Sequence, residues 1–196
     1  IVAECRQLAG CGVREVILLG QTVTSYGRRL IPVREGCSPF VQLLDAVSGV
    51  EGIDRIRFTA PHPGGYGDDL VAAYSRLPKL CASAHVPMQS GSNRILRLMR
   101  RGYTCERFLV LVDKLRRARP GIGLTTDFIV GFPGETDADF ADTLRVVDEV
   151  EFDNAYLFKY SPRPHTLAAS LPDQVPVAVR ERRHAELLGR VNRLAE

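Results

Sequence analysis

The stretch "TTDFIVGFPGETDADF", residues 125–140, decides which fold we expect from this chain. Its first half belongs to an apolar run over 123–131 that predicts a buried strand. A turn built on Gly131, Pro133 and Gly134 follows, and Thr136, three residues before Asp139, predicts the capped start of a helix. A strand that enters a helix through a turn with so little side-chain bulk leaves room for another molecule against the backbone.

Four other short apolar runs predict strands at 14–20, 55–60, 82–88 and 154–161, with helical segments between them. These runs are apolar on both faces, which favours a buried parallel sheet over a half-exposed antiparallel one. Strands that alternate with helices indicate stacked βαβ units. No glycine-rich dinucleotide fingerprint follows the first strand. We therefore expect an α/β fold that is a partial (β/α) barrel with outer helices.

Composition limits the classes of function. The chain has 196 residues, of which 45% are hydrophobic and 25% charged, and its net charge of +3 permits nucleic acid as a partner without requiring it. No apolar run approaches the ~18 residues of a membrane span, so we expect a cytoplasmic protein without membrane association. Five cysteines stand too far apart in sequence for a close-spaced zinc or iron–sulfur ligand set. We expect them to be reduced thiols.

Polar or backbone-exposing residues follow every predicted strand, where the function of a parallel barrel collects. The candidates are Gln21 and Thr22, Thr59 and His62, Gln89 and Ser90, Gly131, Gly134 and Glu135, and Ser161 and Arg163. No pair of carboxylates and no Ser-His-Asp order stands out among them. Backbone groups and the side chains of Thr59 and Gln89 suit a nucleoside-like ligand better than a metal.

Each candidate has a plain structural alternative. Glu135 can complement the positive end of the following helix, and His62, between two prolines, can be a turn residue. Gln89 and Ser90 can belong to the cap of a helix that begins near Ser92. The arginines spaced along this helix and along the last one are typical of solvated faces: Arg94, Arg97, Arg100, Arg101, Arg180, Arg182, Arg183, Arg190 and Arg193. His85 within a strand is typical of a core histidine.

Taken together, the motifs resemble those of the radical S-adenosylmethionine (SAM) methylthiotransferases. The strings that carry the resemblance are "LLGQTVTSYG", "RIRFTAPHP", "HVPMQSGSNRILRLMRRGYT", "TDFIVGFPGETDADFADTL" and "FDNAYLFKYSPRPHTLAA", and together they cover nearly the whole chain. The chain is most similar to the branch that adds a methylthio group to C2 of isopentenyl-adenosine beside the anticodon of tRNA. Another modified tRNA adenosine stays open as the target.

The resemblance implies a radical SAM barrel, with SAM at the carboxyl ends of the strands and two [4Fe–4S] clusters in the intact enzyme. It implies that Gly20, Gln21 and Thr22 hold the SAM amino group, that Gln89 and Ser90 lie near the ribose, and that Ile129 and Gly131 meet the adenine. Glu135 would fix the turn, and Ser161 and Arg163 would lie on the substrate side. The tRNA anticodon loop is the implied partner.

The chain departs from the family pattern where iron is bound. The C-x-x-x-C-x-x-C loop and the first strand that precedes it are missing, so no residue of this sequence is predicted to bind metal. We expect a piece of a longer protein, with a core over 1–175 and a closing basic helix over 176–196, that is inactive alone. Two other hypotheses stay open: a non-catalytic barrel remnant that binds RNA or a protein, and a barrel lyase or aldolase with Lys159 as the Schiff-base lysine.

Overall fold

The computed structural model describes residues 1–59 and 62–194, and it divides into two compact units. Unit 1 consists of Ile1–His85 and Asp113–Gly123, and unit 2 consists of Val86–Val112 and Leu124–Glu196. Residue 60, expected in the second strand, and residues 195–196, expected in the last helix, lie outside the described residues. Each unit is described by itself below.

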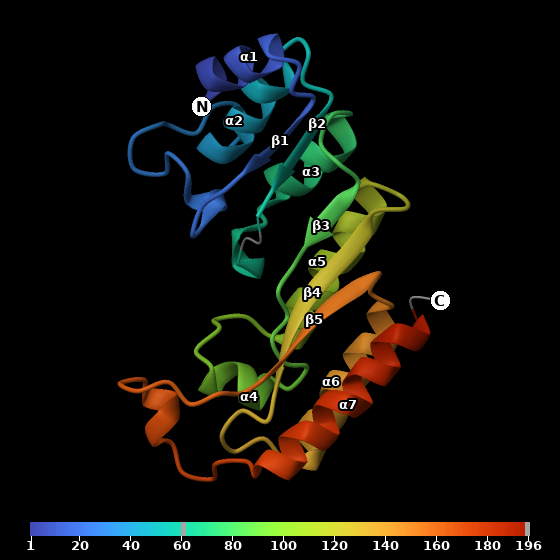
Figure 1. The fold of residues 1–196 in the computed structure, drawn as a ribbon. Coiled ribbons are helices and arrows are strands. Elements are labelled where there is room, and N and C mark those ends of the chain that lie inside the picture. Colours follow the sequence, from blue (N-terminus) through green and yellow to red (C-terminus); the bar gives the residue numbers. More distant parts are fainter. Residues whose placement is uncertain (60–61, 195–196) are drawn as a thin grey trace. The chain divides into compact units, whose positions relative to one another are not determined.

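Unit 1 is built from short parallel strands and helices (Figure 1). The strands are β1 (Glu15–Leu18), β2 (Arg55–Phe58) and β3 (Ser83–His85), and the α-helices are α1 (Val2–Gly10), α2 (Pro39–Ser48) and α3 (Asp68–Arg76). Two 3-10 turns, η1 (Val23–Ser25) and η2 (Pro63–Gly65), follow the ends of β1 and β2. β1 pairs with β2 in parallel, with Val16 opposite Ile56, and α1 and α2 lie side by side.

Helix α2 begins at a serine cap, and its apolar side makes the core of unit 1. The Ser38 hydroxyl accepts a hydrogen bond from the Val41 amide at 3.4 Å, and Pro39 occupies the first turn, where no amide hydrogen is needed. Leu44 and Val47 of α2 are fully buried, as is Ile56 of β2. Burying such aliphatic side chains contributes about 1.5–3 kcal/mol each relative to leaving them exposed.

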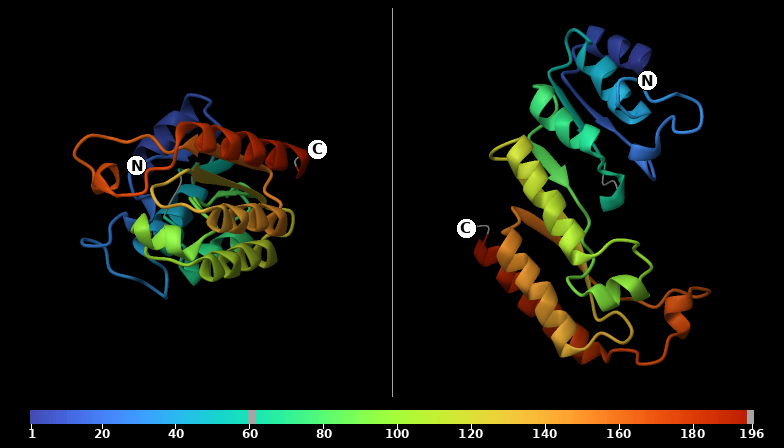
Figure 2. Two further views of the ribbon diagram at one scale, coloured as in Figure 1. Left: turned by 90° about the horizontal axis from the view of Figure 1, so that it is seen from below. Right: turned by 180° about the vertical axis from the view of Figure 1, so that it is seen from behind.

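Unit 2 contains the quoted stretch. Its strands are β4 (Gly123–Val130), of which Gly123 is counted with unit 1, and β5 (Asn154–Lys159). The helices are α4 (Asn93–Leu98), α6 (Asp137–Val150), α7 (Val177–Leu194), the 3-10 turn η3 (Leu167–Ser170) and the first part of α5 (Cys105–Ala118). β4 and β5 are parallel, with Ile129 opposite Phe158. Figures 1 and 2 show α6 and α7 side by side, and α7 packs on β5.

The sheet of unit 2 has one face buried against helices and one open face. Burial alternates strictly along β4, with Leu124, Thr126, Phe128 and Val130 buried. The Phe128 ring contacts Phe152 edge-on, with 5.9 Å between the ring centroids. The next side chains along each strand, such as those of Ile129 and Phe158, therefore point away from this core.

The predicted α/β class with parallel strands is confirmed, and so is the capped start of α6. The Thr136 hydroxyl accepts from the Asp139 amide at 3.3 Å, and the Asp139 carboxylate accepts from the Thr136 amide at 2.8 Å. The third predicted strand, 82–88, is longer than the observed β3. In its second half the Thr126 hydroxyl accepts from the Met88 amide at 2.9 Å and donates to the Val86 carbonyl at 2.8 Å. A side chain thus replaces part of the backbone ladder.

The pairings among the described strands do not close into a ring, as expected of a partial barrel. In the described ranges, no helix is long and apolar enough to cross a membrane. The predicted division at residue 175 stays a prediction; α7 begins at Val177 and packs within unit 2.

Candidate functional site at the strand ends

The turn after β4 is held by Glu135. Gly131 and Gly134 have φ angles of +72° and +79°, a left-handed conformation that few residues other than glycine adopt readily. The Gly131 amide donates to Oε1 of Glu135 at 2.9 Å, and the Gly134 amide donates to the Asp173 carbonyl at 2.9 Å. Glu135 therefore fixes the turn, as the family resemblance implies, instead of only complementing the end of α6.

Arg183 of α7 completes the support of this turn. Its Nη1 donates to Oε1 of Glu135 at 2.7 Å and to the Glu135 carbonyl at 3.2 Å, and its Nη2 donates to Asp137 at 2.8 Å. The side chains of Arg183 and Glu135 are only 4% and 2% exposed, and the guanidinium lies over the Phe140 ring, 5.6 Å from its centroid. The solvated-face hypothesis for the last helix is therefore wrong at Arg183.

The buried carboxylate of Glu135 is shifted toward its protonated form. Burial raises the pKa of Glu135, while the Gly131 amide and the Arg183 guanidinium oppose that rise. A carboxylate with these two fixed partners is structural. It holds the turn and leaves no free acid or base there.

Gly131 is also needed by a neighbour within the chain. A Cβ built on Gly131 would overlap the aliphatic stem of Arg180. The Arg180 guanidinium in turn donates to the Tyr160 carbonyl at the end of β5. Arg180 therefore explains the absence of a side chain at position 131, and the contact of Gly131 with an adenine ring stays a prediction.

A hollow of about 540 Å³ opens at the carboxyl ends of β4 and β5 in unit 2. Its lining brings together four of the predicted cofactor and substrate residues, Gln89, Ile129, Ser161 and Arg163. The predicted Ser90, Gly131 and Glu135 do not line it. Sites for small organic ligands have volumes of roughly 300–1,000 Å³, are mostly apolar, and carry a few placed polar groups.

Gln89 enters this hollow from an unusual backbone conformation. Its φ angle is +68°, its amide donates to the Asp127 carbonyl at 2.7 Å, and its carbonyl accepts from the Ile129 amide at 2.9 Å. Two backbone bonds to β4 thus hold a conformation that costs a residue other than glycine about 1 kcal/mol. The neighbouring Ser90 hydroxyl accepts from the Ser92 amide at 3.2 Å, so Ser90 supports the start of α4, as the structural alternative holds.

Six further residues of this lining were not among the predicted site residues: Asp127, Phe158, Lys159, Tyr160, Thr166 and Ala168. The Tyr160 hydroxyl is buried and has no hydrogen-bond partner among the described residues, which is uncommon for a buried polar group. The sequence contains a pattern that could have indicated the two aromatic residues. In "NAYLFKYS" the aromatic residues stand at every second position, so a strand places them on one side.

The predicted site residues of unit 1 lie in the loops after β1 and β2. Gly20, Gln21 and Thr22 form an exposed turn before η1. The Thr59 hydroxyl is buried without a partner in the described part of the chain, which suits a ligand-binding role. His62 accepts from the Gly64 amide at 3.1 Å through Nδ1, so it does have the turn role that the alternative gave it. A common rim for these residues and those of unit 2 stays a prediction.

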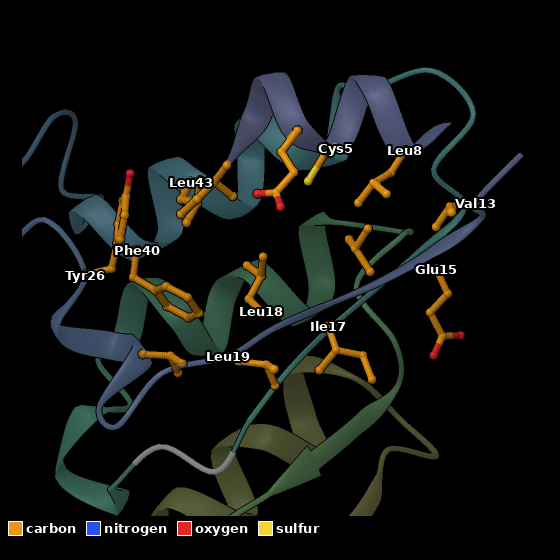
Figure 3. A pocket seen from close by; sticks show the side chains of 14 residues that line it. Cys5, Leu8, Val13, Glu15, Ile17, Leu18, Leu19, Tyr26, Phe40 and Leu43 are labelled. Atoms are coloured by element: carbon orange, nitrogen blue, oxygen red, sulfur yellow. The ribbon is translucent and has the colours of Figure 1, made fainter. Parts of the chain in front are cut away.

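Unit 1 has a hollow of its own, of about 430 Å³, beside β1 (Figure 3). Figure 3 shows side chains of α1, α2 and β1 around it, including Cys5, Leu8, Phe40 and Leu18. Ile17 is 54% and Leu19 76% exposed, although both are large and apolar. None of the predicted site residues lines this hollow, so it is not the predicted nucleoside site.

The family model of the radical SAM superfamily matches residues 1–147. The chain belongs to the radical SAM superfamily. Two solved structures agree in fold. Coproporphyrinogen III oxidase from Escherichia coli has a TM-score of 0.56 at 16% identity, over 95% of this chain and 55% of its own. Methylornithine synthase has a TM-score of 0.61 at 14% identity, over 97% and 52%. These matches confirm the predicted radical SAM type of fold.

Two curated relatives of this radical SAM chain carry the name tRNA-2-methylthio-N(6)-dimethylallyladenosine synthase. The protein from Opitutus terrae is 60% identical over 96% of this chain and 39% of its own length. The protein from Akkermansia muciniphila is 52% identical over 100% of this chain and 42% of its own length. The chain thus spans about two fifths of the relatives it matches. The predicted resemblance to the methylthiotransferases is confirmed.

Members of the radical SAM superfamily use SAM and a [4Fe–4S] cluster, and the residues described here fit these two groups unequally. The hollow of unit 2, with an amide, a hydroxyl and an apolar floor, suits a nucleoside. By contrast, no group of three or more His, Cys, Asp or Glu side chains within 1–59 and 62–194 could hold a metal ion. The free cysteines Cys5 and Cys11 lie on α1 and just after it. This donor set does not fit a cluster.

Proposed function

We propose that this chain is the SAM-binding core of a tRNA methylthiotransferase of the radical SAM type. The proposed reaction adds a methylthio group to C2 of isopentenyl-adenosine beside the anticodon, in the cytoplasm. The observation that carries the proposal is that four residues implicated by the family resemblance, Gln89, Ile129, Ser161 and Arg163, line one nucleoside-sized hollow. The names of the relatives from Opitutus terrae and Akkermansia muciniphila support the same activity.

In this proposal SAM lies along the ends of the strands, and each contact comes from residues already described. Within unit 2 the proposed SAM-binding residues are Gln89 and Ile129, and Ser90 and Glu135 act by shaping the loops. The roles of Gly20, Gln21, Thr22, Thr59 and His62 of unit 1, and the contact of Gly131 with adenine, remain predictions of the family resemblance. Ser161 and Arg163 take the substrate side. When bound, SAM would supply the methyl group and, after receiving one electron from the iron–sulfur cluster of the intact enzyme, the adenosyl radical. The chain would orient SAM and shield the reacting atoms from water.

A chimera tests the proposal. The segment of the Opitutus terrae relative that aligns with this chain is replaced by this chain, and tRNA from cells that lack the synthase is analysed by nucleoside mass spectrometry. Because the two are 60% identical over 188 residues, we expect the chimera to fold and to produce the methylthiolated nucleoside. A folded, cluster-loaded chimera that leaves the tRNA unmodified would refute the proposal.

Site residues are tested in the same chimera. Gln89→Ala is expected to lower the apparent affinity for SAM, since it removes the amide from the hollow while the two backbone bonds of residue 89 can persist. Gln42→Ala is the matched control, because the Gln42 amide bonds only loop carbonyls of unit 1, at 2.9 Å each. Equal SAM affinity in both variants would remove Gln89 from the proposed site.

A second candidate function is favoured by the missing metal-ligand group among the described residues. In it the chain is a non-catalytic barrel that binds RNA through its arginines. Titration of tRNA at two salt concentrations, with and without SAM, separates the two. RNA binding that falls steeply with salt and ignores SAM favours the second function.

A further inference from the structure

Phe158 exposes an aromatic ring at the mouth of the hollow in unit 2. It is 52% exposed, although a phenylalanine in a strand is usually covered. Its partner across the sheet is Ile129, and both line the hollow. Tyr156, two residues earlier on the same side of β5, is 55% exposed. The open face of β5 therefore presents aromatic surface beside a cavity.

Exposure rises from β4 to β5 across this hollow. Gln89 is 6% exposed and Ile129 is half-buried, whereas Phe158 and the loop residues Ser161 and Arg163 are exposed. Among the described strands β5 pairs only with β4, so its far edge is open. A small cofactor can reach the buried end near Gln89. A polymer can reach only the exposed end, where Phe158 lies.

One cation at the exposed end is not neutralised within the described part of the chain. The Lys159 ammonium donates to both carboxylate oxygens of Glu181, at 2.7 and 2.9 Å. The Arg163 guanidinium, which also lines the hollow, takes part in none of the ion pairs or side-chain hydrogen bonds of the described residues. An unpaired guanidinium beside an exposed aromatic ring complements a nucleotide, which has a flat base and a charged phosphate.

We propose that Phe158 is a stacking platform for one base of an RNA chain and that Arg163 contacts the adjoining phosphate. This inference rests on the proposed function, and it assigns the RNA to the exposed end of the hollow. Stacking of a base on an aromatic side chain contributes about 1–3 kcal/mol and accepts any base, because every base has a flat face. The platform holds a base, and other groups would have to select adenosine.

The absence of tryptophan from this chain makes a direct test possible. Phe158→Trp introduces a single indole at the platform, and its emission is followed while the chain is titrated with hexa-adenylate RNA at low salt. We expect saturable quenching. Val110→Trp is the matched control, since Val110 is 56% exposed on α5, whose Phe108 packs against the buried face of the sheet through Phe152. Its emission should not respond.

Affinity provides the second measurement. Phe158→Leu keeps an apolar side chain but removes the flat ring, and should weaken binding of hexa-adenylate roughly tenfold, which corresponds to the loss of one modest stack. Arg163→Ala should weaken binding and make it less dependent on salt. Tyr26→Leu, at a 37% exposed aromatic residue of unit 1, is the control and should leave affinity unchanged.

The inference is overturned if hexa-adenylate fails to quench the indole at position 158, or if Phe158→Leu binds as tightly as the parent chain. It is also overturned if SAM quenches this indole and displaces the RNA, because the platform would then belong to the cofactor. None of these results tests the proposed function, which is tested separately by the activity of the chimera. Conversely, an inactive chimera with quenching intact would leave an RNA-binding platform without the reaction.

Discussion

A single buried arginine links the last helix to the turn on which the proposed SAM site depends. Arg183 faces Glu135, Asp137 and the Phe140 ring, and almost none of its surface reaches solvent. Breaking a buried ion pair by removing one partner leaves the other charge uncompensated, which typically costs about 3–5 kcal/mol.

Arg183→Met should therefore lower the free energy of unfolding by about 3 kcal/mol, measured by urea denaturation. Arg182→Met is the matched control. It removes a neighbouring arginine that is 64% exposed and lies 3.6 Å from Asp137, and its effect should stay under about 1 kcal/mol. Equal effects in the two variants would show that the buried pair contributes nothing particular.

Gly131 is expected to resist substitution for two separate reasons, its φ angle of +72° and the overlap of any Cβ with Arg180. Gly102 has a similar φ angle of +69° and nothing within 4 Å of a built Cβ. Gly102→Ala should cost about 1 kcal/mol for the backbone alone, and Gly131→Ala clearly more. The melting temperatures of both variants check this. The double variant Gly131→Ala/Arg180→Ala removes the overlap but keeps the backbone strain, so it should recover part of the stability that Gly131→Ala loses.

Sequence patterns predicted some of these residues and missed others. Glu135 was predicted to fix its turn from the family resemblance, which rests on the motif around Gly131 and Glu135. Arg183 lies 48 residues after Glu135, and nothing in a helical spacing of arginines tells which one faces the core. That choice depends on how α7 packs against α6, which is a tertiary fact. Phe158 was not predicted because the predicted site residues were chosen as polar or backbone-exposing groups at strand ends, and a phenylalanine is neither.

At the scale of elements, the start of α6 is stabilised by a carboxylate with several donors. Asp139 accepts from the Ser92 hydroxyl at 2.6 Å and from the Thr136 amide at 2.8 Å, and it pairs with Arg94. Burial acts to raise the pKa of Asp139, but the bonds from Arg94, Ser92 and Thr136 outweigh it, and the pKa is lowered well below its usual range. Arg94 pairs with Asp139 and still lies on the exposed side of α4, as the solvated-face hypothesis holds.

This lowered pKa predicts how stability varies with acidity. The ionised Asp139 contributes its full stabilisation above the unfolded pKa of about 3.9, and that contribution is lost as the pH falls from there toward the lower folded pKa. Urea midpoints should therefore drop steeply below about pH 4, and Asp139→Asn should flatten that drop while lowering stability at pH 7. Asp142→Asn, at an exposed pair with Arg145, is the control that should change neither.

The free edge of β1 is a second feature at this scale. Among the described strands β1 pairs only with β2, so its other edge is open. Ile17 in β1 and Leu19 just after it are largely exposed, and an open, apolar strand edge is a template for pairing with another chain. Leu19→Lys should therefore reduce self-association at high protein concentration, measured by sedimentation velocity. Val33→Lys, at an apolar loop residue that is 64% exposed, should not. If both variants associate like the parent, the edge is not the cause.

Strand and helix positions followed from periodicity because each segment buries its own apolar side. The predicted strands at 123–131 and 154–161 contain β4 and β5, and the predicted cap at Thr136 marks the start of α6. The second half of the predicted 82–88 strand failed for a local reason. The Thr126 hydroxyl competes for the bonds of the ladder, and a threonine in an apolar run gives no warning of this.

At the scale of the whole molecule, the sequence motifs predicted the superfamily, and the relatives carry the name of the predicted branch. The arrangement of the candidate site was less predictable. Motif order along the chain places Gln21, Gln89 and Gly131 at strand ends, but it does not say which of them share a cavity. In unit 2 the cavity takes Gln89 and excludes Gly131, since Arg180 covers that glycine.

Reconstitution with iron and sulfide tests the cofactor assignment for this chain. Because no suitable ligand group exists among the described residues, we expect no stoichiometric [4Fe–4S] absorption under anaerobic conditions. The chimera with the Opitutus terrae relative is the positive control. A cluster near one equivalent on the chain itself would mean that its cysteines assemble a site the structure does not display.

Because the backbone of Gln89 is left-handed, the contribution of this residue to stability can be separated from its contribution to ligand binding. Glycine would relieve the conformational penalty there, so Gln89→Gly is expected to give a protein at least as resistant to heat as its parent. Ligand binding that is lost in this variant would therefore have depended on the side-chain amide. A substitution that leaves the protein at least as stable to heat, but removes the one buried amide from the hollow, would give direct evidence that this side chain serves binding and not folding.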